Sequence, residues 1–133
     1  MTAAQAEWLA KGDADLGAAS ALMRRRIQQY PDQVCFLCQQ SAEKCLKAFL
    51  VANQIAFPKT HNLLQLSDLC VTVDARFATL ATGLAQIELY AVEIRYPGTQ
   101  ATVSDARQAL GVARRVHRLV KQRLADMSQP KLL

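Results

Sequence analysis

Apolar side chains recur at spacings of three and four residues along most of this chain, and this period constrains the fold more than any other feature. The clearest stripe consists of Phe77, Leu80, Leu84, Ile87, Ala91 and Ile94. Such spacings place side chains on one face of an α-helix and form the seam of a helical bundle. No stretch shows the strict alternation of a half-buried strand. We therefore expect an all-α protein.

Turn-forming residues divide the chain into helices. We predict long helices over residues 3–29, from the Tyr30–Asp32 break to about residue 53, and over 77–95 and 105–127, with a short helix over 63–69. Ser104 is the expected N-cap of the last helix. Connections this short favour an antiparallel up-and-down bundle of four long helices plus one short helix. Residues 1–127 then form one domain, and residues 128–133 form a flexible tail.

Length and composition exclude several classes of protein. With 133 residues, of which 51% are hydrophobic, the chain can bury a core, so disorder is excluded. No apolar run approaches the roughly 18 residues of a membrane helix, so no membrane partner is expected. Four cysteines without a signal peptide do not make a disulfide scaffold, and we expect a cytoplasmic protein.

Cys35 and Cys38 form a C-x-x-C motif, which is found in zinc and redox sites. Together with Cys45 they lie on the apolar stripe of a predicted helix, and no second C-x-x-C pair accompanies them. We predict buried free thiols, with neither a metal nor a cofactor.

Three polar side chains, Gln40, Glu43 and Lys47, flank the apolar stripe of the second helix. Their spacing is typical of a solvated face stabilised by an i,i+4 ion pair, and the alternative is one side of a binding site. Gln39 projects from the apolar side of the same helix. A buried amide must be hydrogen-bonded, so Gln39 either ties helices together or faces a partner.

Further candidate site residues lie at helix ends. Lys59 and His61 precede the short helix, and Arg95 and Tyr96 end the third long one. The structural interpretation makes His61 a neutral cap and Arg95 a cap or an ion pair. The functional interpretation makes them an imidazole that faces a nucleotide and a guanidinium that binds phosphate, with Tyr96 as a stacking surface. His117 falls on the apolar stripe of the last helix and is expected in the core.

The net charge of +5 comes entirely from the end of the chain. Residues 1–104 carry nine basic and nine acidic groups, whereas residues 105–133 carry seven basic and two acidic ones. On the last predicted helix a basic stripe within about 60° of arc consists of Arg107, Arg114, Arg118 and Lys121. Such a stripe serves solubility, or it binds phosphates with an affinity that falls with salt.

Three segments together resemble the motifs of the HEPN family (higher eukaryotes and prokaryotes nucleotide-binding), in its prokaryotic stand-alone type. The run Phe36–Ala48 is similar to the family's QQ–EK helix, the segment Lys59–Leu63 to its KTHDL junction, and Arg95–Pro97 to its RYP helix end. Order and separation agree, from Trp8 to about Leu124. One departure is Asn62, which stands where the family usually has aspartate.

The resemblance implies a bundle that is commonly a homodimer and often accompanies a minimal nucleotidyltransferase, in some cases as a toxin–antitoxin pair. Catalytic members cleave RNA without metal, using an arginine followed four to six residues later by a histidine. Thr99, Gln100 and Ala101 occupy those positions after Arg95. The ribonuclease signature is therefore missing, which favours a protein without catalytic residues.

Our leading hypothesis is a non-catalytic nucleotide- or RNA-binding bundle that works as a homodimer beside a nucleotidyltransferase-type partner. Its site would combine Gln40, Glu43, Lys47, Lys59, His61, Arg95 and Tyr96. One alternative is a metal-independent ribonuclease toxin in which His61 performs acid–base chemistry and Arg95 stabilises the phosphate. The other is a structural dimerisation module without any ligand.

Overall fold

The computed structural model describes residues 2–25, 29–93 and 96–128, and within these ranges every regular element is helical. The elements are α1 (Ala3–Arg25), α2 (Pro31–Ala52), α3 (Leu63–Val71), the 3-10 helix η1 (Ala75–Leu80), α4 (Ala81–Glu93) and α5 (Val103–Ser128). The prediction of an all-α bundle with four long helices and one short helix is confirmed. The predicted continuations over residues 26–28 and 94–95, and residues 129–133 of the predicted tail, lie outside the described residues.

Two helix starts differ from the sequence prediction because side chains cap them earlier. Asp74 accepts a hydrogen bond from the backbone N–H of Arg76, and the third long segment therefore begins as the 3-10 helix η1 before it becomes α4. α5 starts before the expected cap. Thr102 Oγ1 accepts from the Asp105 N–H at 3.0 Å, and the Asp105 carboxylate accepts from the Thr102 N–H at 2.9 Å. This reciprocal pair, rather than Ser104, caps the helix.

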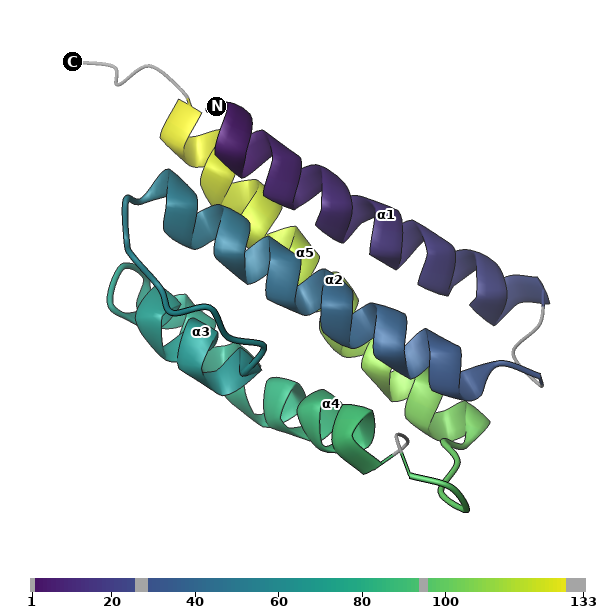
Figure 1. Ribbon diagram of the computed structural model, residues 1–133. Helices are drawn as coiled ribbons and strands as arrows, with labels where there is room; N and C mark the ends of the chain where they lie inside the picture. Colours follow the sequence, from purple (N-terminus) through teal and green to yellow (C-terminus); the bar gives the residue numbers. More distant parts are fainter. Residues whose placement is uncertain (1, 26–28, 94–95, 129–133) are drawn as a thin grey trace.

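α2 is the central helix of the bundle. It packs against α1, α3, α4 and α5, whereas α1 contacts only α2 and α5 among the described elements. Figure 1 shows α1 on one side of α2, α3 and α4 on the other, and α5 behind it. A helix surrounded in this way buries side chains on every face. Polar residues of α2 that are buried as a result include Gln39, Ser41, Glu43 and Lys47.

α1 and α2 approach each other closely at Gly12. The Ser41 hydroxyl donates a hydrogen bond to the Gly12 carbonyl oxygen at 2.8 Å. A Cβ atom on Gly12 would lie 2.7 Å from Cys45 Sγ and 3.3 Å from the Ser41 carbonyl oxygen. The absence of a side chain at this position therefore sets the distance between the two helices.

We expect Gly12→Ala to lower the free energy of unfolding by about 1–3 kcal/mol, because the added methyl group overpacks the α1–α2 contact. Gly17→Ala is the matched control on the same helix, since a Cβ there meets no atom within 4 Å. The control should gain up to about 1 kcal/mol from helix propensity. Urea denaturation measures both, and a Gly12→Ala protein as stable as the Gly17→Ala protein would contradict this account of the contact.

The prediction of buried free thiols at Cys35, Cys38 and Cys45 is confirmed, and Cys70 of α3 is free and buried as well. Burial is the largest cause that raises the pKa of each thiol to about 12. They pack as small apolar side chains within the core. In residues 2–25, 29–93 and 96–128 no cluster of three or more His, Cys, Asp or Glu side chains is placed to hold a metal ion. No described helix combines the length and apolarity needed to cross a membrane.

Candidate functional site

Glu43 and Lys47 are buried in the middle of α2, with only 3% and 6% of each residue exposed. The interpretation of this flank as a solvated helix face is therefore wrong. Trp8 of α1 and Phe57 of the connection between α2 and α3 cover it, and the Lys47 ammonium lies 5.1 Å and 5.8 Å from their ring centroids. Aromatic faces at these distances attract the ammonium group.

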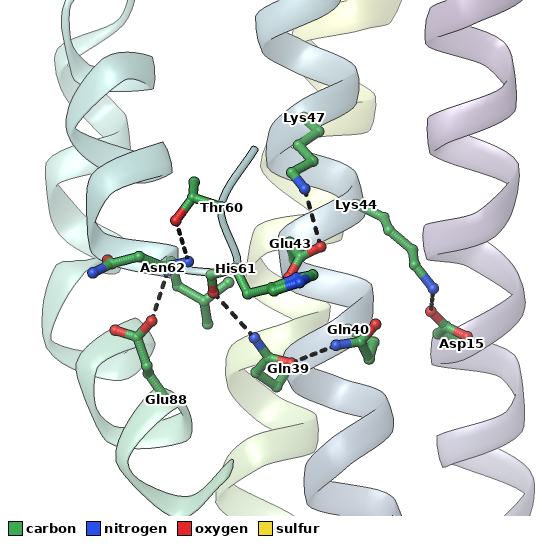
Figure 2. Close-up of polar contacts among 11 residues, drawn as sticks. Asp15, Gln39, Gln40, Glu43, Lys44, Lys47, Thr60, His61, Asn62 and Glu88 are labelled. Carbon is green, nitrogen blue, oxygen red and sulfur yellow. Dashed lines mark hydrogen bonds and ion pairs between the residues drawn. The ribbon is translucent and has the colours of Figure 1, made fainter. Parts of the chain in front are cut away.

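The Glu43 carboxylate joins two basic side chains. Lys47 Nζ donates to Glu43 Oε2 at 3.2 Å, and His61 Nδ1 lies 2.9 Å from Glu43 Oε1. Figure 2 shows the three side chains meeting beside α2. Since an ionised carboxylate can only accept a hydrogen bond, His61 Nδ1 carries the proton of this contact. The His61 side chain is 80% exposed, so its imidazole is anchored at one edge and open to solvent at the other.

Gln39 ties the backbone of His61 to the same helix. Its side-chain amide donates to the His61 carbonyl oxygen at 3.4 Å, and its own oxygen accepts from the Gln40 amide at 2.8 Å. The buried amide therefore links α2 to the connection that precedes α3, which is one of the two roles expected from the sequence. Glu43 and Gln39 together hold both the ring and the backbone of His61 (Figure 2).

The start of α3 is capped by its neighbours and not by His61, so the interpretation of His61 as a cap is wrong. Asn62 Oδ1 accepts from the Gln65 N–H at 2.9 Å, which is the hydrogen bond that an aspartate would make. Glu88 of α4 accepts from the Leu63 N–H, also at 2.9 Å. Because these groups satisfy the helix N-terminus, the His61 imidazole is left for the contact with Glu43.

These groups line a hollow of about 480 Å³ between α1, α2 and the 53–62 connection. It brings together five residues of the expected site: Gln40, Glu43, Lys47, Lys59 and His61. The rings of Trp8 and Phe57 add two apolar walls. Neither ring was predicted from the sequence as a site residue. The available signal was the position of Phe57 just before Pro58 and the KTH segment.

The remaining expected site residues lie elsewhere. Arg95 falls outside the described residues, and Tyr96 is 65% exposed and does not line the hollow. His117 is a correction to the sequence analysis, because it is not a core residue. It lies at the edge of the bundle, where its Nε2 contacts the Asp13 carboxylate of α1. His117 lies at the side of the apolar stripe that faces α1, so its ring reaches the Asp13 carboxylate at the surface.

The predicted basic stripe is exposed on α5. Arg107, Arg114, Arg118 and Lys121 all point to solvent. α5 packs its apolar face against α2, so the basic face points away from α2. None of the four residues lines the hollow.

The fold and the hollow define a class of protein. It is a helical-bundle domain in which the buried Glu43 carboxylate ties His61 of the 53–62 connection to the central helix α2. The sequence model of one family, described as the HEPN domain, matches residues 5–123. The chain therefore belongs to the HEPN domain family.

A solved structure agrees with this assignment. The crystal structure of ST0689, an archaeal HEPN homologue, superimposes with a TM-score of 0.70 at 23% sequence identity. The match covers 92% of this chain and 98% of the archaeal chain, so the two share the fold over nearly their whole length. No curated protein is similar enough to this chain to count as a match.

Proposed function

We propose that this domain binds a nucleotide or RNA in the hollow between α1, α2 and the 53–62 connection. The observation that carries the proposal is the presence of two aromatic walls, Trp8 and Phe57, beside two exposed basic side chains, Lys59 and His61. Nucleobases stack on aromatic rings, and phosphates pair with cationic groups. A volume of about 480 Å³ falls within the range of small-molecule sites.

The basic groups of the hollow have different roles in this proposal. Lys47 is buried and paired with Glu43, so its charge is already compensated. Lys59 and His61 are exposed at the rim, and they supply the contacts to phosphate. The Glu43 carboxylate accepts a hydrogen bond from His61 Nδ1 and so orients the imidazole. The opposite edge of the ring then faces the ligand.

The proposal extends to partners on the strength of family membership. The domain works as a homodimer and as the non-catalytic partner of a minimal nucleotidyltransferase, in a pair of the toxin–antitoxin type. Exposed large apolar side chains, which protein interfaces use, include Phe36, Leu89 and Tyr96. A dimer mass in light scattering supports the first part, and a monomer mass at micromolar concentration contradicts it.

The test uses Trp8, the single tryptophan of the chain, as a reporter inside the hollow. Titration with AMP, ATP and a short RNA should change its fluorescence in a saturable way, because a stacked base quenches indole. Lys59→Gln combined with His61→Asn should weaken binding by about tenfold or more, since two phosphate contacts of roughly 1–2 kcal/mol are lost.

The control for that titration is Arg24→Gln, which removes one positive charge from the exposed end of α1. It should bind like the unaltered protein. Equal affinities of the Lys59/His61 variant and the control would contradict the placement of the ligand. If no nucleotide or RNA alters the signal, the network is only a structural tie, as in a dimerisation module.

A second candidate function is ribonuclease activity, and the contact between Glu43 and His61 favours it. An imidazole whose Nδ1 is held by a buried carboxylate is the arrangement of a general base. His61 would then perform acid–base chemistry, with Arg95 as the phosphate stabiliser. Incubation of the unaltered protein and of His61→Ala with RNA separates the candidates. Cleavage that is lost in His61→Ala supports the enzyme, whereas equal or absent cleavage rules it out.

A further inference from the structure

A second basic region lies on α5, outside the hollow described above. Between residues 107 and 122 the solvent-exposed side chains of this helix are Arg107, Gln108, Arg114, Arg115, Arg118, Lys121 and Gln122. Five of these are cationic, and none is acidic or apolar. From Arg107 to Lys121 the row extends over about 21 Å at 1.5 Å per residue. We call this set of residues the α5 basic face.

The α5 basic face is hollowed where it meets η1. A depression of about 370 Å³ has Leu80 and Leu119 in its lining, together with Thr79, Gln122 and three arginines, Arg76 of η1 and Arg115 and Arg118 of α5. Guanidinium groups present planar sets of donors that match phosphate oxygens. Arg115 and Arg118 therefore make this depression a suitable anchor point for a phosphate.

Of the three arginines at the depression, only Arg76 is paired with a carboxylate among the described residues. Asp74 is engaged by the Arg76 guanidinium at 2.9 Å and by Arg123 Nε at 2.8 Å. The hydrogen bonds from Arg76 hold the pKa of Asp74 below its usual range, so the carboxylate stays ionised and fixes Arg76 at the rim. Asp126 lies 3.5 Å from Arg123 Nη1. Arg115 and Arg118 have no ion-pair partner among the described residues.

The composition of the α5 basic face indicates the kind of partner. Protein interfaces depend on aromatic and apolar anchors in their centre, whereas the apolar side chains of the depression, Leu80 and Leu119, are buried and half-buried. A phosphate backbone needs only a row of positive charges, and a nucleic-acid strand presents one phosphate every 3.4 Å or so along a duplex. A row of about 21 Å therefore spans several phosphates.

We propose that the α5 basic face, anchored in the Arg76–Arg115–Arg118 depression, docks the phosphate backbone of a nucleic-acid strand. α5 lies behind α2 in Figure 1, and its basic face points away from α2. The depression and the hollow around His61 share no lining residue. This docking surface is independent of the proposed nucleotide hollow, and either can exist without the other.

The test is fluorescence anisotropy of a short labelled single-stranded oligonucleotide with the full chain. Five phosphate contacts on a single strand predict an affinity that falls by about 100-fold between 50 and 200 mM salt. Arg115→Gln combined with Arg118→Gln should weaken binding by about tenfold or more and reduce the slope of log affinity against log salt by about 1.4. Both side chains are exposed, so the melting temperature should stay unchanged.

The matched control is Arg24→Gln combined with Arg25→Gln, which removes the same charge from exposed positions at the end of α1. It should leave the affinity within about twofold of the unaltered protein. If both double variants lose affinity for the oligonucleotide equally, the net charge of the protein and not the α5 basic face attracts the strand. That result would overturn the proposal. Absence of binding at about 50 mM salt would overturn it as well.

Two competitors identify the ligand. Poly-glutamate is added so that its carboxylate concentration equals the phosphate concentration of the strand. Displacement of the strand under this condition would indicate an acidic protein as the partner and overturn the assignment to nucleic acid. Inorganic phosphate is added at the same concentration as the phosphate groups of the strand. If it displaces the strand, the surface binds single phosphates and the assignment to a nucleic-acid strand is overturned. Weak competition by both supports docking of the strand. Trp8 fluorescence, which reports the other hollow, separates failure of this proposal from failure of the first.

Discussion

Replacing Glu43 with alanine is expected to lower the free energy of unfolding by about 3–5 kcal/mol. Lys47 is only 6% exposed, and Glu43 is the carboxylate with which it pairs, at 3.2 Å. Without Glu43 the folded state must hold an uncompensated ammonium group away from water. The variant also releases the His61 ring from its 2.9 Å contact. Urea denaturation followed by circular dichroism measures the loss.

The chain offers a matched control for this prediction. Glu7 and Lys11 form the same i,i+4 pair on α1, 3.8 Å apart, but both side chains are largely exposed. Glu7→Ala should therefore cost less than about 0.5 kcal/mol. Combining Glu43→Ala with Lys47→Met should recover most of the stability, because it removes the buried charge as well. A Glu43→Ala protein as stable as the Glu7→Ala protein would show that the buried pair does not hold the fold.

The second large effect is a loss of stability at alkaline pH. Burial raises the pKa of Cys35, Cys38, Cys45 and Cys70 from 9.0 to about 12 in the folded state. Between about pH 9 and 12 the unfolded chain therefore binds fewer protons than the folded one. The stabilisation is fully present below about pH 9 and falls as the pH rises, by about 1.4 kcal/mol per pH unit for each thiol.

Four thiols predict that the free energy of unfolding drops by about 5 kcal/mol between pH 8 and pH 10. Urea denaturation at a series of pH values gives the slope directly. Cys38→Ala combined with Cys70→Ala removes two of the four groups and should halve the slope, whatever it does to stability at neutral pH. An unchanged slope would mean that other groups, and not the buried thiols, cause the alkaline loss.

Much of the fold could be predicted from local sequence patterns. The stripe from Phe77 to Ile94 indicated a helix, turn-forming residues marked the breaks, and the cysteines on an apolar stripe indicated buried thiols. Each of these is a property of neighbouring positions along one helix, since the period of 3.6 residues fixes which side chains share a face. Helix starts were less accurate, because the caps at Asp74 and Thr102 depend on single hydrogen bonds.

The candidate site was only partly predictable. The motif resemblance selected Gln40, Glu43, Lys47, Lys59 and His61, and the structure places these five around one hollow. The resemblance could not indicate that Trp8 is a wall of this hollow, because that contact joins α1 to a connection far along the chain. It also could not separate the acid–base contact of His61 from a helix cap, since both fit the same position in the sequence.

The sequence by itself determined the approximate positions of the helices, the burial of Cys35, Cys38 and Cys45 and the concentration of positive charge on the last helix. The tertiary structure decided that Glu43 and Lys47 are buried, that Asn62 and Glu88 cap α3, and that His61 is left to contact Glu43. The physical reason is that a helical wheel describes the faces of one helix and not its neighbours. Burial on the polar flank of α2 depends on which segments pack beside it, and those segments are distant in the sequence.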